Sequence, residues 1–470
     1  MIMDSGKDSP NPGTTVSGFC TRVEARTARV GVIGLGYVGL PLALLSAKAG
    51  FQTTGFDIDP NKTEKLQRGK SYIQHISDAS VSEAVGTMHF QATADFTRLR
   101  EMDAIIICVP TPLDKHREPD LSFVRKTAEV VGANLQRGQL VVLESTTYPG
   151  TTDEEVLPIL EKAALKCPVS PYTTDGVTVT ASEGGDPDFF LAFSPEREDP
   201  GNQKFQNRQV PKVIGGVNAS SALAAQALYQ SFFEHTYLVS SSRTAEMTKL
   251  LENIYRSVNI ALVNELKLLC MRMGIDIWEV IEAAKTKPFG FSAFYPGPGL
   301  GGHCIPIDPF YLTWKAREYE FPTRFIELAG ETNTAMPHHV VNYVTAALGQ
   351  RGKTLHGSRV LVLGVAYKKD IDDVRESPAL KILELLGTHG ALAAYHDPFV
   401  PRLGKMRKYD FGLQSIPLTP ETLRAHDCAL IVTDHSTVDY DLVVGESALV
   451  VDTRNATARV RHHREKIVRC

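Results

Sequence analysis

The chain has 470 residues, of which 43% are hydrophobic and 22% charged, with a formal net charge of −4 at pH 7. This is the composition of a soluble globular protein of roughly two to four domains, and it does not favour nucleic acid or an anionic membrane as a partner. No apolar run approaches the roughly 20 residues that a transmembrane helix requires.

The seven cysteines are scattered and form no CxxC pair: Cys20, Cys108, Cys167, Cys270, Cys304, Cys428 and Cys470. An odd number without paired spacing argues against a disulfide framework and against a zinc site. We therefore expect a protein of the reducing cytoplasm that holds no metal.

The first predicted elements follow a tail. Residues 1–28 are rich in Ser, Thr, Pro and Gly and have no apolar core, so we expect a disordered tail and no signal peptide. A β-branched run over 29–33 precedes a glycine-rich turn, and residues 40–49 have the composition of a helix. A second strand over 52–56 ends at Asp57.

Strand, glycine turn and helix in this order predict dinucleotide binding. Gly34 and Gly36 allow the tight turn and the approach of the backbone to a pyrophosphate, and Gly39 lets helix and strand pack closely. The helix N-terminus then faces the phosphates, and Asp57 accepts hydrogen bonds from the ribose, which favours NAD over NADP. The remaining expected NAD contacts are Tyr37, Val38, Lys62, Thr111, Thr146 and Arg375.

Three further strands end in polar residues. The apolar runs 104–109, 140–143 and 190–193 are typical of a parallel sheet buried on both faces. The carboxyl ends of such strands form the ligand crevice of an open α/β sheet, so the polar residues beyond them are candidate site residues. They are Thr111, Thr146 and Glu196. The alternative for each one alone is a turn or capping residue.

Residues 244–274 repeat apolar side chains at three- and four-residue steps, which predicts a long helix. Lys249 and Asn253 share one face of it and can point together into a site. The alternative is a solvated lysine on a polar face. Shorter helices are expected over 277–284, 323–333 and 337–348.

Glycine and proline crowd residues 294–309, which predicts a loop. The loop presents Cys304 directly after Gly301, Gly302 and His303, with Asp308 four residues further on. A thiol held there is a nucleophile when its thiolate is favoured, and the alternative is a buried structural cysteine.

A second α/β domain is predicted from Gly357 onward. Strands are expected over 359–363, 392–395, 429–432 and 448–451, with a helix over 377–386. Gly364-Val365-Ala366 departs from the glycine fingerprint, so we expect no second dinucleotide. Basic residues at the strand ends, Lys368, Arg375 and Arg454 among them, suit a nucleotide diphosphate, unless they are solvated loop residues.

The order of these motifs resembles that of the UDP-sugar 6-dehydrogenases over nearly all of the chain beyond residue 28. The matching motifs are Gly34–Gly39, Ser145-Thr146, Pro195-Glu196, Lys249 with Asn253, Gly301–Asp308, Lys368-Lys369-Asp370, Arg375-Glu376-Ser377 and Arg454. The resemblance implies an α/β fold with two Rossmann-like doubly wound domains joined by a long central helix. It implies an NAD-binding domain over 29–215, a central helical dimerisation domain with the cysteine loop over 216–335, and a UDP-sugar-binding domain over 336–470. The expected assembly is a homodimer or a higher homo-oligomer.

The resemblance further implies oxidation of a sugar C6 alcohol to a carboxylate with two NAD+. Cys304 would capture the aldehyde as a thiohemiacetal and then carry a thioester. Lys249 and Asn253 would stabilise an oxyanion, Asp308 and Thr146 would position and deprotonate a water or the C6 hydroxyl, and Glu196 would act as the base for hydrolysis. Which carboxylate acts in which step stays open. The implied substrate contacts are Glu196, Arg197, Lys249, Asn253, Gly301, Lys368 and Arg454.

The stretch 296–312 is most similar to members that act on UDP-N-acetylglucosamine and so implies a role in surface polysaccharide (O-antigen) synthesis. The UDP-glucose group carries a small polar residue where His303 stands here. Its upstream arginine, which reaches the sugar from the partner subunit, is replaced by residues 288–291, Pro-Phe-Gly-Phe. The alternatives are UDP-glucose, UDP-N-acetylgalactosamine or UDP-N-acetylmannosamine as substrate, a two-electron hydroxy-acid dehydrogenase, and a non-catalytic nucleotide-sugar-binding protein.

Overall fold

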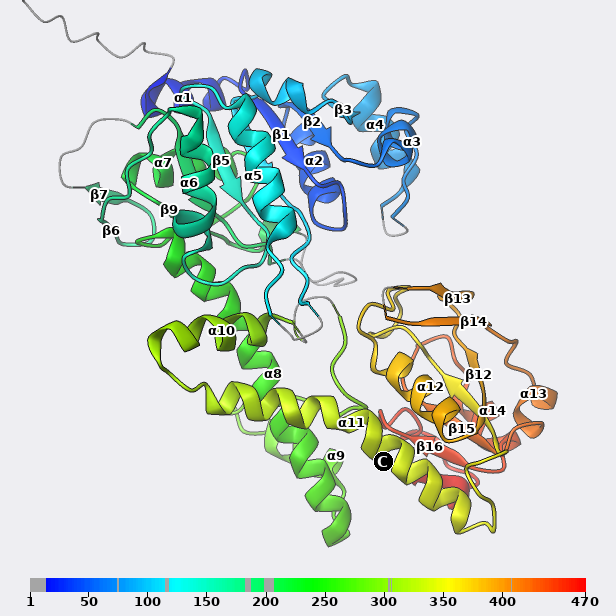
Figure 1. Cartoon of the computed structure of the whole chain (residues 1–470). Coiled ribbons are helices and arrows are strands. Elements are labelled where there is room, and N and C mark those ends of the chain that lie inside the picture. Colours follow the sequence, from blue (N-terminus) through cyan, green and yellow to red (C-terminus); the bar gives the residue numbers. More distant parts are fainter. Residues whose placement is uncertain are drawn as a thin grey trace, which may run out of the picture. The chain divides into compact units, whose positions relative to one another are not determined.

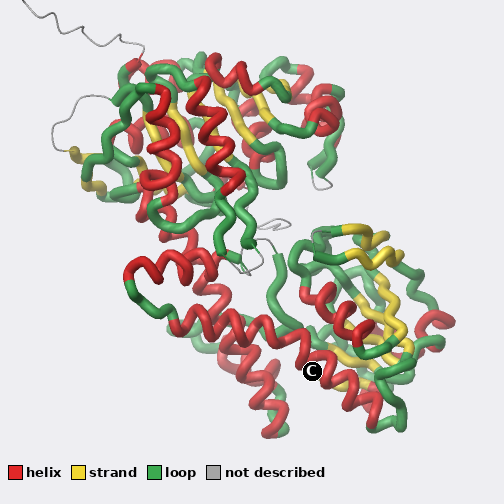
Figure 2. Tube along the Cα trace, viewed as in Figure 1, coloured by secondary structure: helices red, strands yellow, loops and turns green. Residues whose placement is uncertain are grey.

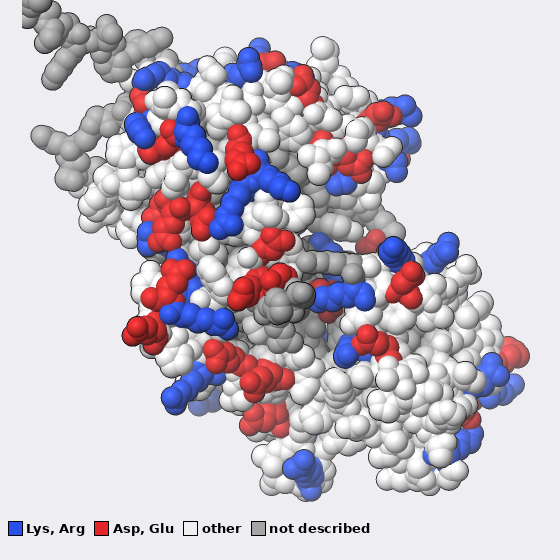
Figure 3. Space-filling model, viewed as in Figure 1, with Lys and Arg blue, Asp and Glu red and all other residues white. Residues whose placement is uncertain are grey.

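The computed structural model describes residues 14–73, 76–114, 118–181, 187–197, 207–302, 305, 307–406 and 408–470. The chain forms two compact units, Met1–Leu251 and Glu252–Cys470, in each of which helices cover a sheet (Figures 1 and 2). Acidic and basic side chains are interspersed over the visible face of each unit (Figure 3). In the described part of the chain, no helix combines the length and the apolar character needed to cross a membrane.

The first unit contains an eight-stranded sheet in the order β10-β9-β8-β5-β4-β1-β2-β3. The strands are β1 (Arg29–Ile33), β2 (Gln52–Phe56), β3 (Phe90–Thr93), β4 (Ala104–Ile107), β5 (Leu140–Leu143), β8 (Phe190–Phe193), β9 (Lys212–Gly216) and β10 (Thr236–Leu238). All neighbours are parallel except β8 and β9. From β3 to β8 this is the 3-2-1-4-5-6 strand order of a dinucleotide-binding fold, whose ligand crevice lies where the order reverses, beside β1 and β4.

The helices of the first unit are α1 (Val16–Glu24), α2 (Gly39–Lys48), α3 (Pro60–Gln67), α4 (Asp78–Gly86), α5 (Ser122–Asn134), α6 (Leu157–Leu160) and α7 (Ala219–Gln230). Shorter helical turns are η2 (Phe96–Glu101), η3 (Thr151–Val156), η4 (Glu161–Ala163) and η5 (Asn207–Gln209). A hairpin of β6 (Tyr172–Thr174) and β7 (Val179–Ala181), which the sequence did not predict, stands apart from the main sheet.

Helix α1 corrects the prediction of a disordered tail over residues 1–28. Thr15 caps the helix by accepting from the Gly18 N–H, and Phe19 and Val23, four residues apart, are buried. Burying these two apolar side chains offsets the cost of ordering a polar segment. The prediction is therefore wrong for residues 16–24, and residues 1–13 lie outside the described part of the chain.

The long helix α8 (Ser242–Met273) contains the boundary between the units. It is followed in the second unit by α9 (Ile277–Lys285), α10 (Asp308–Ala316), η6 (Arg317–Tyr319) and α11 (Arg324–Gly349). Two expected helices are one, because α11 continues through Pro337. The predicted glycine-proline loop ends two residues early, since Asp308 and Pro309 already form the first turn of α10, where proline is tolerated.

The second unit has a five-stranded parallel sheet in the order β12-β11-β15-β16-β17. Its strands are β11 (Arg359–Leu363), β12 (Leu392–His396), β15 (Cys428–Ile431), β16 (Val450–Asp452) and β17 (Ile467–Arg469). The other elements are α12 (Pro378–Thr388), α13 (Pro420–Arg424), α14 (Tyr440–Glu446), η7 (Arg464–Lys466) and the hairpin of β13 (Arg402–Lys405) with β14 (Asp410–Gln414). This is the 2-1-3-4-5 doubly wound order. The predicted pair of Rossmann-like α/β folds with the long helix α8 between them in the sequence is confirmed, whereas β17 and the hairpin were not predicted.

Candidate active site

The glycine turn between β1 and α2 has the shape that a dinucleotide requires. Gly34 has a φ of +91°, and a Cβ there would lie 2.6 Å from the Cys108 carbonyl oxygen. A Cβ on Gly39 would lie 2.0 Å from the Gly34 carbonyl oxygen. A Cβ on Gly36, by contrast, would have no described atom within 4 Å. The close backbone packing therefore requires glycine at positions 34 and 39. Gly36 leaves the turn open beside the N-terminus of α2, where Tyr37 and Val38 lie half-buried.

Asp57 lies against this turn, as the spacing predicted. Its buried carboxylate accepts from the Leu35 N–H (3.1 Å) and from the Asp59 N–H (3.0 Å). Lys62 Nζ lies 3.2 Å from the same carboxylate. An open glycine turn with an acidic group at the end of β2 fits NAD. Sequence reasoning missed Tyr72, whose hydroxyl donates to the Leu35 carbonyl, and burial raises the pKa of Tyr72.

The loops after β4 and β5 are tied together at the crevice. Ser145 Oγ donates to the Val109 carbonyl at 2.7 Å. Thr111 on the first loop is buried, and Thr146 on the second is half-buried. The structure therefore places both predicted threonines on neighbouring loops at the carboxyl end of the sheet.

Glu196, just beyond β8, has two lysines beside it. Lys249 of α8 donates to the Glu196 backbone carbonyl, so this lysine is not a solvated surface residue. Lys212, at the start of β9, lies 3.4 Å from Glu196 Oε2 and 2.9 Å from Glu144 Oε2. Arg197 instead donates to the Pro211 carbonyl at 2.7 Å.

Sequence reasoning missed Lys212, Glu144 and Tyr229. Tyr229 of α7 donates its hydroxyl to Glu144, and all three side chains are buried. Burial raises the pKa of Glu144 against the opposing effect of Lys212. The pKa of Lys212 is raised, because Glu144 and Glu196 together outweigh burial, which by itself lowers it. The sequence signal that could have indicated this cluster is the position of Glu144 directly after a buried strand.

In the second unit, Asn253 of α8 donates its amide to Asp308 Oδ2, and both side chains are buried. These residues lie far apart in the sequence, yet the structure brings them together as a pair. Cys304, the predicted nucleophile four residues before Asp308, lies outside the described residues, as does His303.

The predicted nucleotide-diphosphate residues lie on loops of the second unit. Arg454 Nε donates to Asp434 at 3.3 Å, and its guanidinium lies against Gly297, where a Cβ would come within 2.5 Å of Nη1. The Gly302 N–H donates to the Arg375 carbonyl at 3.1 Å, and a Cβ on Gly301 would lie 2.6 Å from Tyr367 Cβ. Gly301 therefore packs against the segment that contains Lys368.

Arg375, expected to contact NAD, forms a two-pronged ion pair with Asp373, with Nε–Oδ2 and Nη2–Oδ2 distances of 2.9 and 2.6 Å. Among the residues that the structure describes, no group of three or more His, Cys, Asp or Glu side chains is placed to hold a metal.

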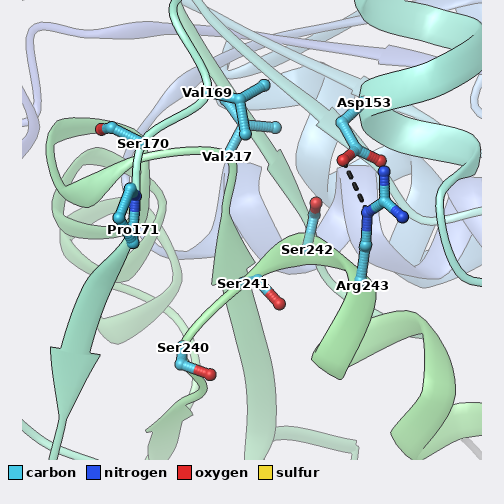
Figure 4. Close-up of a pocket in the computed structure, with 9 residues that line it drawn as sticks. All are labelled: Asp153, Val169, Ser170, Pro171, Val217, Ser240, Ser241, Ser242 and Arg243. Carbon is cyan, nitrogen blue, oxygen red and sulfur yellow. Dashed lines mark hydrogen bonds and ion pairs between the residues drawn. The ribbon is translucent and has the colours of Figure 1, made fainter.

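A separate pocket of about 280 Å³ lies in the first unit at the start of α8 (Figure 4). Its lining includes Ser240, Ser241 and Ser242, and Arg243 Nε donates to Asp153 across it at 2.8 Å. No predicted site residue lines this pocket.

Three domains of one family match this chain. The NAD binding domain of the UDP-glucose/GDP-mannose dehydrogenase family matches residues 28–233, the central domain residues 243–335, and the UDP binding domain residues 361–459.

Similar proteins span most of the chain. The UDP-N-acetyl-D-glucosamine 6-dehydrogenase of Pseudomonas aeruginosa is 34% identical over 87% of this chain and 90% of its own length. The UDP-N-acetyl-D-mannosamine dehydrogenase of Escherichia coli K12 is 35% identical over 87% of this chain and 94% of its own. The solved UDP-D-ManNAc dehydrogenase of Pyrococcus horikoshii has a TM-score of 0.78 at 32% identity, covering 91% of this chain and 96% of that one.

The fold, the glycine turn and these matches define an NAD-dependent dehydrogenase of UDP-sugars. The chain belongs to the UDP-glucose/GDP-mannose dehydrogenase family, as the sequence resemblance predicted. NAD is its cofactor.

Proposed function

We propose that the enzyme oxidises the C6 hydroxyl of UDP-N-acetylglucosamine to the uronic acid in a four-electron reaction. The observation that supports this most is the buried Asn253–Asp308 contact, because it holds the Asn253 amide against the carboxylate of Asp308, which follows Cys304 by four residues in the sequence. A two-electron dehydrogenase has no use for a cysteine at this point of the chain.

The N-acetyl group of the substrate is supported by the relatives. The two quoted above act by name on UDP-N-acetyl-D-glucosamine and UDP-N-acetyl-D-mannosamine, and the solved Methanosarcina mazei relative is an NDP-N-acetyl-D-galactosaminuronic acid dehydrogenase. The stretch 296–312 favours glucosamine among these sugars, with mannosamine as the alternative. UDP-glucose is disfavoured by His303 and by the sequence over 288–291. The product would feed surface polysaccharide synthesis.

In the proposed chemistry, the Cys304 thiolate adds to the C6 aldehyde, and the Lys249 ammonium and the Asn253 amide stabilise the oxygen of the adduct. NAD, when bound, accepts one hydride in each of the two oxidations. Loss of the second hydride leaves a thioester on Cys304. A water positioned by Thr146 or Asp308 then attacks the thioester carbon, Glu196 takes one proton of the water, and the C–S bond breaks to release the carboxylic acid, which ionises in solution, and the thiolate. Arg197, Gly301, Lys368 and Arg454 would bind the UDP-sugar.

We assign NAD binding to residues 29–215, with Gly34, Gly36, Tyr37, Val38, Gly39, Asp57, Lys62, Thr111, Thr146 and Arg375 as contacts. We assign the central domain to residues 216–335 and UDP-sugar binding to residues 336–470. The geometry of the glycine turn supports the first assignment, and the family's UDP binding domain supports the last.

We further propose a homodimer or higher homo-oligomer formed through α8. Its exposed apolar side chains recur at helical spacing and include Tyr255, Leu262, Leu266, Leu269 and Met273. Apolar stripes of this kind mark protein–protein interfaces. A cytoplasmic location is supported by the cysteines, since Cys108, Cys167, Cys270, Cys428 and Cys470 are free thiols.

The test is a count of NADH formed per UDP-sugar consumed, with the acid quantified by mass spectrometry over a panel of UDP-hexoses. We expect two NADH per sugar and the highest kcat/KM with UDP-N-acetylglucosamine. Cys304→Ala should lose carboxylate production but still reduce a supplied UDP-sugar 6-aldehyde with NADH, whereas Cys20→Ala on α1 should behave as wild type. Two NADH per sugar from Cys304→Ala at a native rate would refute the mechanism, and equal or higher efficiency with UDP-glucose would refute the N-acetyl assignment alone.

A further inference from the structure

A buried cation in the first unit bridges two carboxylates. Lys212 Nζ lies 2.9 Å from Glu144 Oε2 and 3.4 Å from Glu196 Oε2, with side-chain exposures of 3% for Lys212, 0% for Glu144 and 20% for Glu196. Tyr229 donates its hydroxyl to the other oxygen of Glu144. Lys212 thus links the buried Glu144 to Glu196, which lies at the carboxyl end of the sheet.

The backbone explains how these groups meet. Glu144 follows β5 and Glu196 follows β8, and these strands are parallel neighbours. Lys212 begins β9, which runs antiparallel to β8 and so returns to the same edge. Its ammonium also lies 5.3 Å from the ring centroid of Tyr229 and 5.3 Å from that of Phe233. The lysine is therefore held on several sides.

Stability alone does not explain the arrangement. Removing charges from water costs several kcal/mol per ion, and apolar residues of similar volume often replace buried ion pairs without loss of stability. If Lys212 served only to join β9 to β5, Glu144 would be a sufficient partner. The contact with Glu196 adds a second carboxylate, so that one buried ammonium faces two carboxyl groups.

We propose that Lys212 is a positioning residue for Glu196, which it holds ionised and oriented to take the proton of the hydrolytic water. This inference rests on the proposed function, in which Glu196 is that base. When water attacks the thioester carbon, its proton passes to Glu196 and the electron pair of the C–S bond leaves with Cys304. Glu196 is then neutral, and Lys212 stays paired with Glu144. Glu144 thus prevents an uncompensated buried cation at this stage of the cycle.

The other groups around Glu196 leave this assignment intact. Lys249 of α8 donates to the backbone carbonyl of Glu196, and Arg197 to that of Pro211. Burial raises the pKa of Cys108, beyond β4, and of Tyr229 well above their ordinary values, so both are neutral at pH 7. The acidic limb of the rate profile then belongs to the coupled Glu144 and Glu196 carboxylates under the field of Lys212.

The experiment compares Lys212→Met, Lys212→Arg and Glu196→Gln with wild type in rapid-mixing assays of NADH formation, and detects the thioester by intact-protein mass spectrometry. Lys212→Met should keep the first-turnover NADH burst and the KM for UDP-sugar. Its steady-state kcat should fall on the order of 10- to 100-fold while an acyl adduct accumulates. The acidic limb of kcat should move up by about one pH unit or more. Lys212→Arg should restore most of the rate.

Two outcomes distinguish a failure of the Lys212 assignment from a failure of the proposed role of Glu196. If Glu196→Gln accumulates the adduct but Lys212→Met loses burst and steady state equally, with no adduct and an unmoved pH profile, Lys212 is structural and the inference is wrong. If Glu196→Gln turns over at the native rate, the proposed base itself is wrong, and the role of Lys212 falls with it. Should Lys212→Met fail to fold, the double variant Lys212→Met with Glu144→Gln removes the unpaired buried carboxylate and must show the same adduct.

Discussion

Glu246 on α8 is fully buried and accepts three hydrogen bonds from Gly150 and Thr152, at the start of η3 beyond β5. The Gly150 N–H donates to Oε2 at 2.6 Å, and the N–H and hydroxyl of Thr152 donate to Oε1 at 2.9 and 2.7 Å. Among the described residues it has no ion-pair partner, and Asp153 adds a repelling charge. Burial raises the pKa of Glu246 to about 8, against the lowering effect of the three donors. We choose Glu246→Gln as the perturbation, because the amide mimics the protonated carboxyl.

The pH dependence follows from this shift. The unfolded chain ionises Glu246 near 4.5 and the folded chain near 8, so the folded state binds more protons between these values. The free energy that protonated Glu246 contributes to folding is therefore fully present below pH 4.5 and is lost as the pH rises through 8. At about 1.4 kcal/mol per pH unit, the loss between pH 5 and 7.5 is roughly 3 kcal/mol, or about 6–12 °C in Tm for a unit of this size.

The assay is thermal unfolding of the full chain at several pH values, plotted as the Tm of wild type minus that of Glu246→Gln. This difference should fall from pH 5 to 7.5 by the amount given. Glu129→Gln, at an exposed carboxylate on α5, is the matched control and should give a flat difference. A flat or rising curve for Glu246→Gln would mean that the carboxylate is ionised in the folded protein and that its three donors outweigh burial.

Three further predictions use other features of the structure. Asp57→Ala removes the acceptor of the Leu35 N–H and the acid expected at the ribose, so NAD should bind more weakly and the discrimination against NADP should relax; an unchanged NAD/NADP ratio of kcat/KM would remove Asp57 from the site. Gly36→Ala should leave Tm unchanged but raise the KM for NAD, because the added Cβ enters the open side of the turn. Gly39→Ala should instead lower Tm, because the added Cβ would lie 2.0 Å from a carbonyl oxygen. Equal effects of the two substitutions on Tm would contradict this difference between the two glycines. Lys267 is buried without a hydrogen-bond partner among the described residues, and burial lowers its pKa. The lysine therefore destabilises the folded protein more as the pH falls below the pKa of Lys267 in the unfolded chain. Lys267→Met should raise Tm at pH 7 by the equivalent of about 1 kcal/mol or more, as measured by calorimetry.

Local chemistry in the sequence was sufficient to predict most of the fold. Buried parallel strands read as apolar runs, and the glycine turn with Asp57 follows from steric and hydrogen-bonding demands within 30 residues of chain. Two local patterns led to wrong predictions. Helix α1 buries only two residues from a polar segment, which was predicted to be disordered. Pro337 indicated a boundary between two helices, but α11 continues through it.

The buried polar pairs of the candidate site could not be predicted in this way. Asn253 and Asp308 are separated by 55 residues, Lys212 and Glu144 by 68. In a sequence, a lone lysine or glutamate is most simply interpreted as solvated, because burying it without a partner is costly. Only the adjacency of β5, β8 and the reversed β9 brings Lys212 within reach of Glu144, and the same packing removes the water that would otherwise screen this pair.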